Sequence, residues 1–273
     1  MTFDVDAYLA RIGLVERPAA DLAGLMAIQQ AHRLAIPFEN LDIPLGRGIS
    51  IDPDAVFAKI VVERRGGYCF EQNQLFLRAL LALGFVARPL LARVWLMNEG
   101  AVPPLTHTLN LVTIDGRLWI ADAGFGGSSV PPLLLAEGHE AQTSDGARHR
   151  LVRDPAHEWM LERAGNPHAT DGRARDTLDW QPQYSFTLGT VAPVDLELGN
   201  HWTSTKPGTR FTTLLVASIV TADGFVSLTD RSLGVTIGAD SQRRDIVDAD
   251  DMRGVLAEHF GIMLDADAVA GLI

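Results

Sequence analysis

The feature that most constrains the fold is a change in apolar spacing at Gly84. Before this glycine, apolar residues recur with the 3.6-residue period of amphipathic helices; after it they alternate with the period of two that is typical of strands. Asp21, Asp52-Pro53 and Gly84 itself are helix start and stop signals. The spacing therefore predicts helices near residues 5–12, 22–34, 53–64 and 70–83.

The rest of the chain reads as strands followed by helix. Asp115-Gly116 and Asp223-Gly224 are two-residue hairpin turns between apolar-alternating segments. We expect strands at 86–97, 106–114, 117–123, 184–190, 210–221, 224–229 and 233–237, and helices at 250–260 and 265–272. Residues 136–180 are polar and irregular, which predicts surface loops and short strands.

Charge limits the partners of the chain. Its 273 residues carry 23 Lys and Arg against 34 Asp and Glu, a net charge of −11. A surface this acidic repels nucleic acid and anionic lipid, so we expect neither as the main partner. No apolar run is long enough to span a bilayer, and the first residues lack the pattern of a secretory signal.

One cysteine, Cys69, cannot form an internal disulfide or a cysteine-based zinc site, which is typical of a cytoplasmic protein. The eight histidines lack metal-ligand spacing, so we expect no metal. His149, His157 and His168 fall in the polar stretch and are expected to be exposed.

Cys69 lies in the first turn of a predicted helix, directly after Gly66, Gly67 and Tyr68. The partial positive charge of a helix N-terminus favours thiolate over thiol, and two glycines allow sharp or left-handed backbone before it. The ordinary alternative is that a free cysteine is a small buried hydrophobe. Position alone leaves both interpretations open.

The hairpin predicts partners for this thiol. With a two-residue loop at 115–116, His107 lies opposite Gly124 and Leu109 opposite Asp122, and all four share one face. His107 and Asp122 are then diagonal neighbours within reach of each other. A thiolate gains from an imidazole, and the imidazole gains from a carboxylate that fixes its tautomer.

Five stretches resemble the arylamine N-acetyltransferase family, in its bacterial length, from about residue 30 to 215. They are IPFENL (36–41), RGGYCFEQN (65–73), TH (106–107), DAGFGG (122–127) and NHWTSTKPGTRF (200–211). Ala123 departs from the larger aliphatic residue of many members, which we expect to alter packing only.

The resemblance implies an α+β multidomain fold with a papain- or transglutaminase-like catalytic core. A helical bundle (1–84) would carry the nucleophilic cysteine, a β-barrel (85–192) the histidine and aspartate, and an α/β lid (193–273) would complete the site. It implies transfer of acetyl from acetyl-CoA to arylamines, arylhydrazines or hydrazides by a ping-pong mechanism, in xenobiotic metabolism, by a monomer or homodimer.

The resemblance also implies roles for individual residues. Cys69, His107 and Asp122 would be the catalytic triad, with an acetyl thioester on Cys69. The remaining residues it implicates are Phe38, Thr106, Phe125, Gly126 and Gly127 for substrate binding, and Glu39 and Arg65 as a structural ion pair. Lys206 and Arg210, the cations of the last stretch, are further candidates for contacts to the CoA phosphates, although the family does not assign them.

Three alternatives stay open. The same triad could act as an amide synthase or another acyltransferase with a carrier-bound acyl donor. It could belong to a cysteine protease or transglutaminase that ignores CoA thioesters. The chain could also be a non-catalytic binding protein whose cysteine only packs. Taken without the resemblance, the residues indicate cysteine-dependent acyl transfer or hydrolysis.

Overall fold

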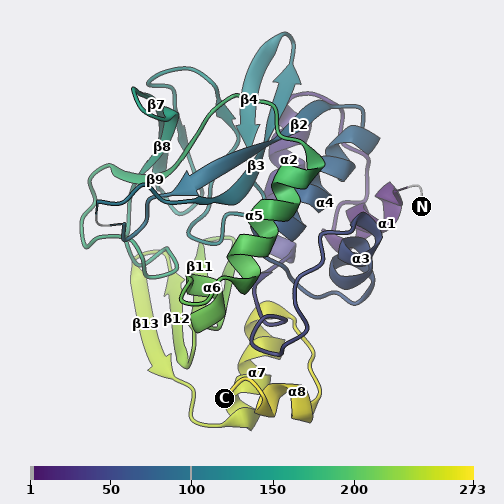
Figure 1. Cartoon of the computed structure of the whole chain (residues 1–273), viewed down its shortest axis with the longest axis vertical. Coiled ribbons are helices and arrows are strands. Elements are labelled where there is room, and N and C mark those ends of the chain that lie inside the picture. The colour runs from purple at the N-terminus through teal and green to yellow at the C-terminus, as the bar shows by residue number, and fades with distance from the viewer. Residues whose placement is uncertain (1–2, 99) are drawn as a thin grey trace.

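The computed structural model describes residues 3–98 and 100–273 and has an α+β fold (Figure 1). The N-terminal part is helical, as the apolar spacing predicts. A π-helical turn, η1, continues α3 directly. The elements before the first long strand are α1 (Val5–Arg11), α2 (Leu22–Ala35), the short strand β1 (Phe38–Glu39), α3 (Pro53–Phe57), η1 (Ala58–Val62) and α4 (Cys69–Ala82).

The central part forms an eight-stranded antiparallel sheet in the order β5-β4-β3-β2-β9-β8-β7-β6. Because β5 also contacts β7, the sheet curls back on itself. Its strands are β2 (Val86–Val94), β3 (Leu105–Ile114), β4 (Arg117–Ala121), β5 (Leu133–Leu134), β6 (Glu140–Gln142), β7 (Arg148–Asp154), β8 (Glu158–Ala164) and β9 (Gln181–Phe186).

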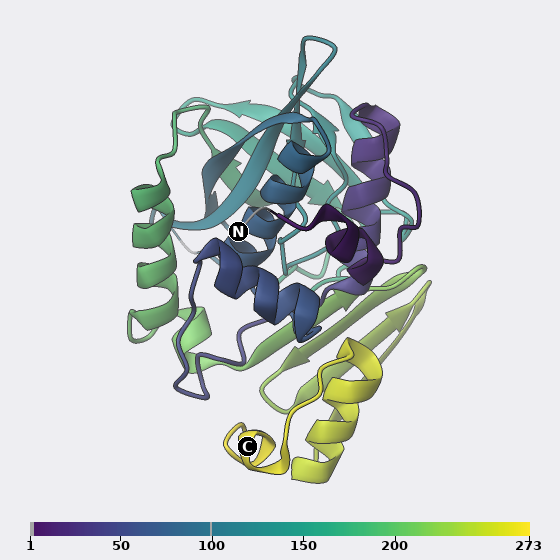
Figure 2. The same ribbon diagram turned by 90° about the vertical axis from the view of Figure 1, so that its right-hand side faces the viewer.

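A second, five-stranded antiparallel sheet has the order β1-β10-β11-β12-β13, so the N-terminal strand β1 forms one edge of a sheet made by the C-terminal part. Helices α7 and α8 lie at the end of the molecule away from the eight-stranded sheet (Figure 2). The elements here are α5 (Pro193–Thr205), α6 (Arg210–Thr213), β10 (Val216–Val220), β11 (Gly224–Thr229), β12 (Ser232–Ile237), β13 (Asp240–Asp245), α7 (Ala249–Phe260) and α8 (Ala266–Ala270).

The hairpin of β3 and β4 divides two cores. Its register pairs Ile114 with Arg117 and Asn110 with Ala121, as the two-residue turn predicts. Val112 and Trp119 on one face pack against the N-terminal helices. The odd-numbered β3 residues point into the curled sheet with Tyr184 of β9. His107 continues this inner face, which is why its side chain is directed to the interior.

Residues 148–164 form the regular strands β7 and β8, so this part of the polar stretch holds the short strands and not the surface loops that were expected beside them. Two other expectations about secondary structure are wrong. Residues 210–213, which were expected to begin a strand, form the short helix α6. The strand itself begins only at Val216. Helix α5 was not expected at all: its exposed face carries Leu198 and Trp202, so it lacks a clear polar side.

The expected exposure of His149 is also wrong. On β7 this residue points inward, and its side chain is fully buried, while His168 is exposed. Burial, and then the charge of Arg163, lower the pKa of His149 to about 3. Burial likewise lowers the pKa of His32 in α2 to about 3. Within the described part of the chain, no helix has the length and apolar character needed to cross a membrane.

The two buried histidines predict a loss of stability in acid. Both remain neutral when folded but take up a proton near pH 6.5 when unfolded, so stability present above pH 6.5 falls as the pH drops toward 3. Each histidine contributes a slope of about 1.4 kcal/mol per pH unit. His149→Leu should remove one such contribution from urea unfolding curves recorded between pH 6.5 and 4.5. The control His168→Asn should keep the wild-type slope; an unchanged slope in His149→Leu would contradict the assignment.

Candidate functional site

The largest concave feature near the sequence motifs is a cavity of about 520 Å³ between the N-terminal helices, the eight-stranded sheet and the α5–α6 segment. Cys69 and His107 both line it. Cys69 is only 3% exposed, but this small exposed area belongs to the cavity wall. A volume of this size is in the range of sites that bind small molecules.

Cys69 is the first residue of α4, and the loop before it is fixed in place. Gly67 forms a bridge to Phe38 of β1, and a side chain at Gly66 would collide with the Pro37 carbonyl. The two glycines therefore allow the backbone of this loop to approach Pro37 and Phe38 closely. The residue of this loop with left-handed backbone geometry is Arg64, with φ 56°. Glu71 closes the helix end by accepting the Tyr68 N–H at 3.0 Å.

The surroundings of Cys69 favour the neutral thiol over an isolated thiolate. Burial first, and then the charge of Asp122, raise the pKa of Cys69 well above its usual range. The Sγ atom lies 3.6 Å from the Thr106 carbonyl, which accepts the thiol proton. The backbone N–H groups of Thr108 and Phe70 act in the opposite direction and favour the thiolate. A thiolate here needs a cation close by, because loss of its proton to solvent is unfavourable.

His107 and Asp122 form a buried pair, with Nε2 of the ring 2.7 Å from Oδ2 of the carboxylate. Burial alone would raise the pKa of Asp122, but the charge and hydrogen bond of His107, with a hydrogen bond from Asn73, outweigh it and lower this pKa. The ring Nδ1 of His107 has no hydrogen-bond partner among the described residues. This nitrogen remains free to exchange a proton within the cavity.

Asn73 and Gln29 support this pair, and sequence reasoning missed both. Asn73 donates to Oδ1 of Asp122 at 2.9 Å and accepts the Ala123 N–H at 3.0 Å. Gln29 of α2 accepts the Asp122 N–H at 3.0 Å. For Asn73 a signal was present, because it lies four residues after Cys69 and so shares its helix face. Gln29 offered none, since its partner is 93 residues away.

The segment after Asp122 is held against α2 and α4. Arg33 of α2 donates to the Phe125 carbonyl at 2.6 Å and to the Ser128 carbonyl at 2.7 Å. A side chain at Gly124 would come within 3.1 Å of the Cys69 Cα. Glycine at this position thus allows close contact with α4, whereas the hairpin alone suggests only that it makes room for the imidazole.

Four of the five predicted substrate-binding residues line the cavity: Phe38, Thr106, Phe125 and Gly126. Gly127 does not line it; its carbonyl accepts the Asp171 N–H at 2.9 Å. Of the two residues expected to contact CoA phosphates, Arg210 lines the cavity and Lys206 does not; Lys206 lies over the Trp202 ring. In the part of the chain that the structure describes, no cluster of histidine, cysteine and acidic residues could hold a metal ion.

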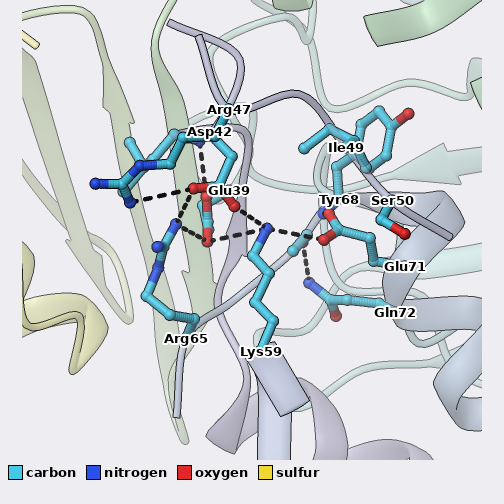
Figure 3. Close-up of polar contacts among 12 residues, drawn as sticks. Glu39, Asp42, Arg47, Ile49, Ser50, Lys59, Arg65, Tyr68, Glu71 and Gln72 are labelled. Carbon is cyan, nitrogen blue, oxygen red and sulfur yellow. Dashed lines mark hydrogen bonds and ion pairs between the residues drawn. The ribbon is translucent and has the colours of Figure 1, made fainter. Parts of the chain in front are cut away.

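Glu39 and Arg65 are part of a larger buried network (Figure 3). Arg65 Nη2 lies 2.8 Å from Oε1 of Glu39 and 3.3 Å from Oδ1 of Asp42. Lys59 of η1 lies 2.7 Å from Asp42 and 2.8 Å from Glu71. Burial raises the pKa of Glu71 to about 7, although the charge of Lys59 opposes this. The network joins β1, η1 and the start of α4, and its extension beyond one ion pair was not predicted.

A cysteine at a helix start and a hydrogen-bonded histidine–aspartate pair on one cavity are typical of the cysteine-dependent enzymes of acyl transfer and hydrolysis. A family model described as N-acetyltransferase matches residues 21–269. The arylamine N-acetyltransferase of Mycolicibacterium smegmatis is 38% identical over 271 residues, covering 97% of this chain and 94% of that protein. The chain belongs to the arylamine N-acetyltransferase family and is a transferase.

Solved structures agree in fold. The Salmonella typhimurium arylamine N-acetyltransferase has a TM-score of 0.89 at 32% identity, covering 98% of this chain and 97% of that one. The Mycobacterium marinum enzyme in complex with CoA has a TM-score of 0.88 at 31% identity, covering 98% of each chain. Family membership excludes the protease, transglutaminase and non-catalytic alternatives as descriptions of this chain.

The buried network predicts a specific stability effect. Lys59→Met leaves Asp42 and Glu71 buried with one partner fewer, which should cost about 3–5 kcal/mol of unfolding free energy. Lys59→Met/Glu71→Gln should recover part of that loss, because one of the uncompensated carboxylates is removed. Urea unfolding at pH 7.5 measures both effects.

Lys206→Met is the matched control, because it removes the other lysine from an exposed position. It should change the unfolding free energy by less than about 0.5 kcal/mol. Equal losses in the single and double variants at Lys59 would show that Lys59 does not act through Glu71.

Proposed function

We propose that this protein transfers acetyl from acetyl-CoA to the amino group of arylamines, arylhydrazines or hydrazides, through an acetyl thioester on Cys69. The observation that carries the proposal is the common cavity of Cys69 and the hydrogen-bonded pair of His107 and Asp122, in a chain of this family. The CoA complex of the M. marinum enzyme supports acetyl-CoA as donor.

In the first half-reaction the Cys69 proton passes to Nδ1 of His107, and the thiolate attacks the carbonyl carbon of the acetyl thioester. Asp122, already bonded to Nε2, stabilises the imidazolium. The backbone N–H of Cys69, at the start of α4, is a donor for the oxyanion. The carbon–sulfur bond to CoA then breaks, and His107 returns the proton to the leaving CoA sulfur.

In the second half-reaction the acceptor amine attacks the acetyl-Cys69 carbonyl. His107 takes the amine proton, the bond to Sγ breaks, and the amide product leaves. Because CoA departs before the acceptor reacts, the kinetics are ping-pong. The aromatic rings of Phe38 and Phe125 line the cavity and favour a flat apolar acceptor over water.

We also propose the three-part organisation that the resemblance implies, with the helical part carrying the nucleophile, the curled sheet a β-barrel with the other two triad members, and the C-terminal part a lid over a papain-like core. The pairing of β1 with β10 connects the first and third parts directly. The ion pair of Glu39 and Arg65 would then hold the loop before Cys69 against β1, the strand through which the helical and C-terminal parts are joined.

Intact-protein mass spectrometry tests the intermediate. Incubation with acetyl-CoA and no acceptor should add one acetyl group, mapped to Cys69 by peptide analysis, and an arylamine or hydrazide should discharge it. Cys69→Ala should take up no acetyl group while keeping the wild-type unfolding curve. No adduct on the wild-type protein, with activity present, would contradict the covalent route. Labelling only by a bulky carrier-bound acyl donor would favour an amide synthase.

His107→Gln tests the proton transfer. Without the imidazole, the buried thiol has no nearby base, so acetylation of Cys69 should slow by about 10²–10⁴-fold. The rate of iodoacetamide labelling should fall at neutral pH and rise only at alkaline pH. His201→Gln, at an exposed position of α5, is the control and should leave both rates unchanged. Wild-type labelling rates in His107→Gln would remove His107 from the mechanism.

A further inference from the structure

A second cavity borders Gln29, the residue whose side chain accepts the Asp122 N–H. Its volume is about 130 Å³, the space of about four water molecules at ~30 Å³ each. Its walls come from α2, from residues 129–132, from residues 142–144 and from Val220 of β10. Among the described residues, none lines both this cavity and that of Cys69. We call this second space the α2 cavity.

Arg33 brings a buried positive charge to the α2 cavity. Among the described residues on the cavity wall, it is the only one with a charged side chain, and it is only 8% exposed. Its two Nη atoms donate to the carbonyls of Phe125 at 2.6 Å and of Ser128 at 2.7 Å. Its Nε is buried and has no hydrogen-bond partner among the described residues. The guanidinium therefore faces peptide dipoles and keeps one donor unused.

The charge of Arg33 is poorly compensated. Burial lowers the pKa of this guanidinium to about 10, and the charge of Asp122 opposes that effect only in part. The two oxygens of Asp122 are bonded to His107 and Asn73, so they are occupied by other donors. A buried cation without a close counter-anion lowers the stability of a fold. An anion bound in the α2 cavity would compensate this charge.

The rest of the wall determines which anion fits. No aspartate or glutamate is among the described residues that line the α2 cavity, in a chain that has 34 of them. The exposed residues Gln30, Gln142 and Ser144 add amide and hydroxyl groups. Most of the other lining side chains are aliphatic: Met26, Leu34, Val130, Pro131, Pro132 and Val220. One cation beside aliphatic walls in a small space suits a short aliphatic chain with a single carboxylate.

Two residues of the α2 cavity also hold the segment that begins at Asp122. Gln29 accepts the Asp122 N–H at 3.0 Å, and its Nε2 donates to the Val130 carbonyl at 2.7 Å. Arg33 binds two carbonyls between these points. Residues 122–130 are thus fastened to the same stretch of α2 that lines the cavity. An anion that stabilises the charge of Arg33 would therefore also stabilise this segment.

We propose that the α2 cavity binds a short aliphatic monocarboxylate, whose carboxylate pairs with Arg33, and that binding stabilises residues 122–130. The carboxylate gains charge-assisted hydrogen bonds from the guanidinium, and the aliphatic chain is removed from water. The inference goes beyond the proposed function, because no step of acetyl transfer uses this cavity. The ligand acts on the segment of Asp122 through α2, without a place in the cavity of Cys69.

Isobutyrate and its uncharged analogue isobutyramide test the role of the charge. Saturation-transfer NMR titrations of the full chain, at an ionic strength held constant with chloride, give the dissociation constant of each. Isobutyrate should bind about tenfold more tightly than isobutyramide, since a charge-assisted hydrogen bond is roughly twice as strong as a neutral one. Arg33→Gln should abolish this preference. Equal affinities of the two ligands for the wild-type protein would overturn the proposal.

Substitutions at Gln30 test the location and leave Arg33 in place, so they remain informative even if Arg33→Gln does not fold. Gln30 is exposed on α2 and lines the cavity. Gln30→Glu puts a negative charge beside the bound carboxylate and should weaken isobutyrate binding about three- to tenfold, whereas Gln30→Lys should strengthen it.

Ala27→Glu is the matched control, because it adds the same charge at an exposed position of α2 that does not line the cavity. Its affinity for isobutyrate should stay within about twofold of the wild type. Equal effects of Gln30→Glu and Ala27→Glu would show that the acid binds elsewhere, and the proposal would fail.

Hydrogen exchange tests the effect on the segment. At ten times its dissociation constant, isobutyrate should slow exchange of the Asp122 N–H and of the amides up to residue 130 by about tenfold, because openings that release the acid become rarer by that factor. Unchanged exchange in the saturated protein would contradict the stabilisation of residues 122–130. None of these measurements uses acetyl-CoA, so their outcome is independent of the proposed function.

Discussion

The hydrogen bonding of the buried Asp122 carboxylate is the interaction on which the geometry of the site depends. The carboxylate is fully buried and stays ionised because His107 and Asn73 bond to its two oxygens, with the Gly124 N–H adding a third contact. These partners come from the strand, the cysteine helix and the following turn. A buried charge is tolerated only when it is paired and hydrogen-bonded, so each partner that satisfies Asp122 also fixes the relative position of the cysteine and the histidine.

The same burial makes an isolated thiolate at Cys69 unfavourable, because both burial and the Asp122 charge raise the pKa of the thiol. The charge of Asp122 has the opposite effect on an imidazolium. The proposed proton transfer from Cys69 to His107 would therefore replace a neutral thiol by an ion pair whose imidazolium Asp122 stabilises, with the total charge of the cavity unchanged. The proposed reactive form is thus a property of Cys69 and His107 together, whereas the neutral thiol has the Thr106 carbonyl as its hydrogen-bond acceptor.

Local signals explain what could be predicted from the sequence. Helix spacing, the glycines before Cys69 and the Asp115-Gly116 turn are short-range features, and together they predict that His107 and Asp122 share a face. The missing parts depend on contacts across long stretches of chain, such as Gln29 with the Asp122 N–H. His149 was misplaced because alternation in β7 is hidden by arginines, which extend from its partly exposed positions.

The buried network behind the start of α4 explains how three acidic residues can lie so near Cys69. Among the described residues, Lys59 and Arg65 are the buried cations that pair with Glu39, Asp42 and Glu71. Arg47, which also contacts Asp42, is half-exposed and contributes little. With a pKa of about 7, Glu71 can take up a proton and bring the buried group to neutrality. The negative charge of Glu71 raises the pKa of Cys69. In the proposed mechanism, a neutral Glu71 would therefore leave the positive end of α4 available to the thiolate and the oxyanion.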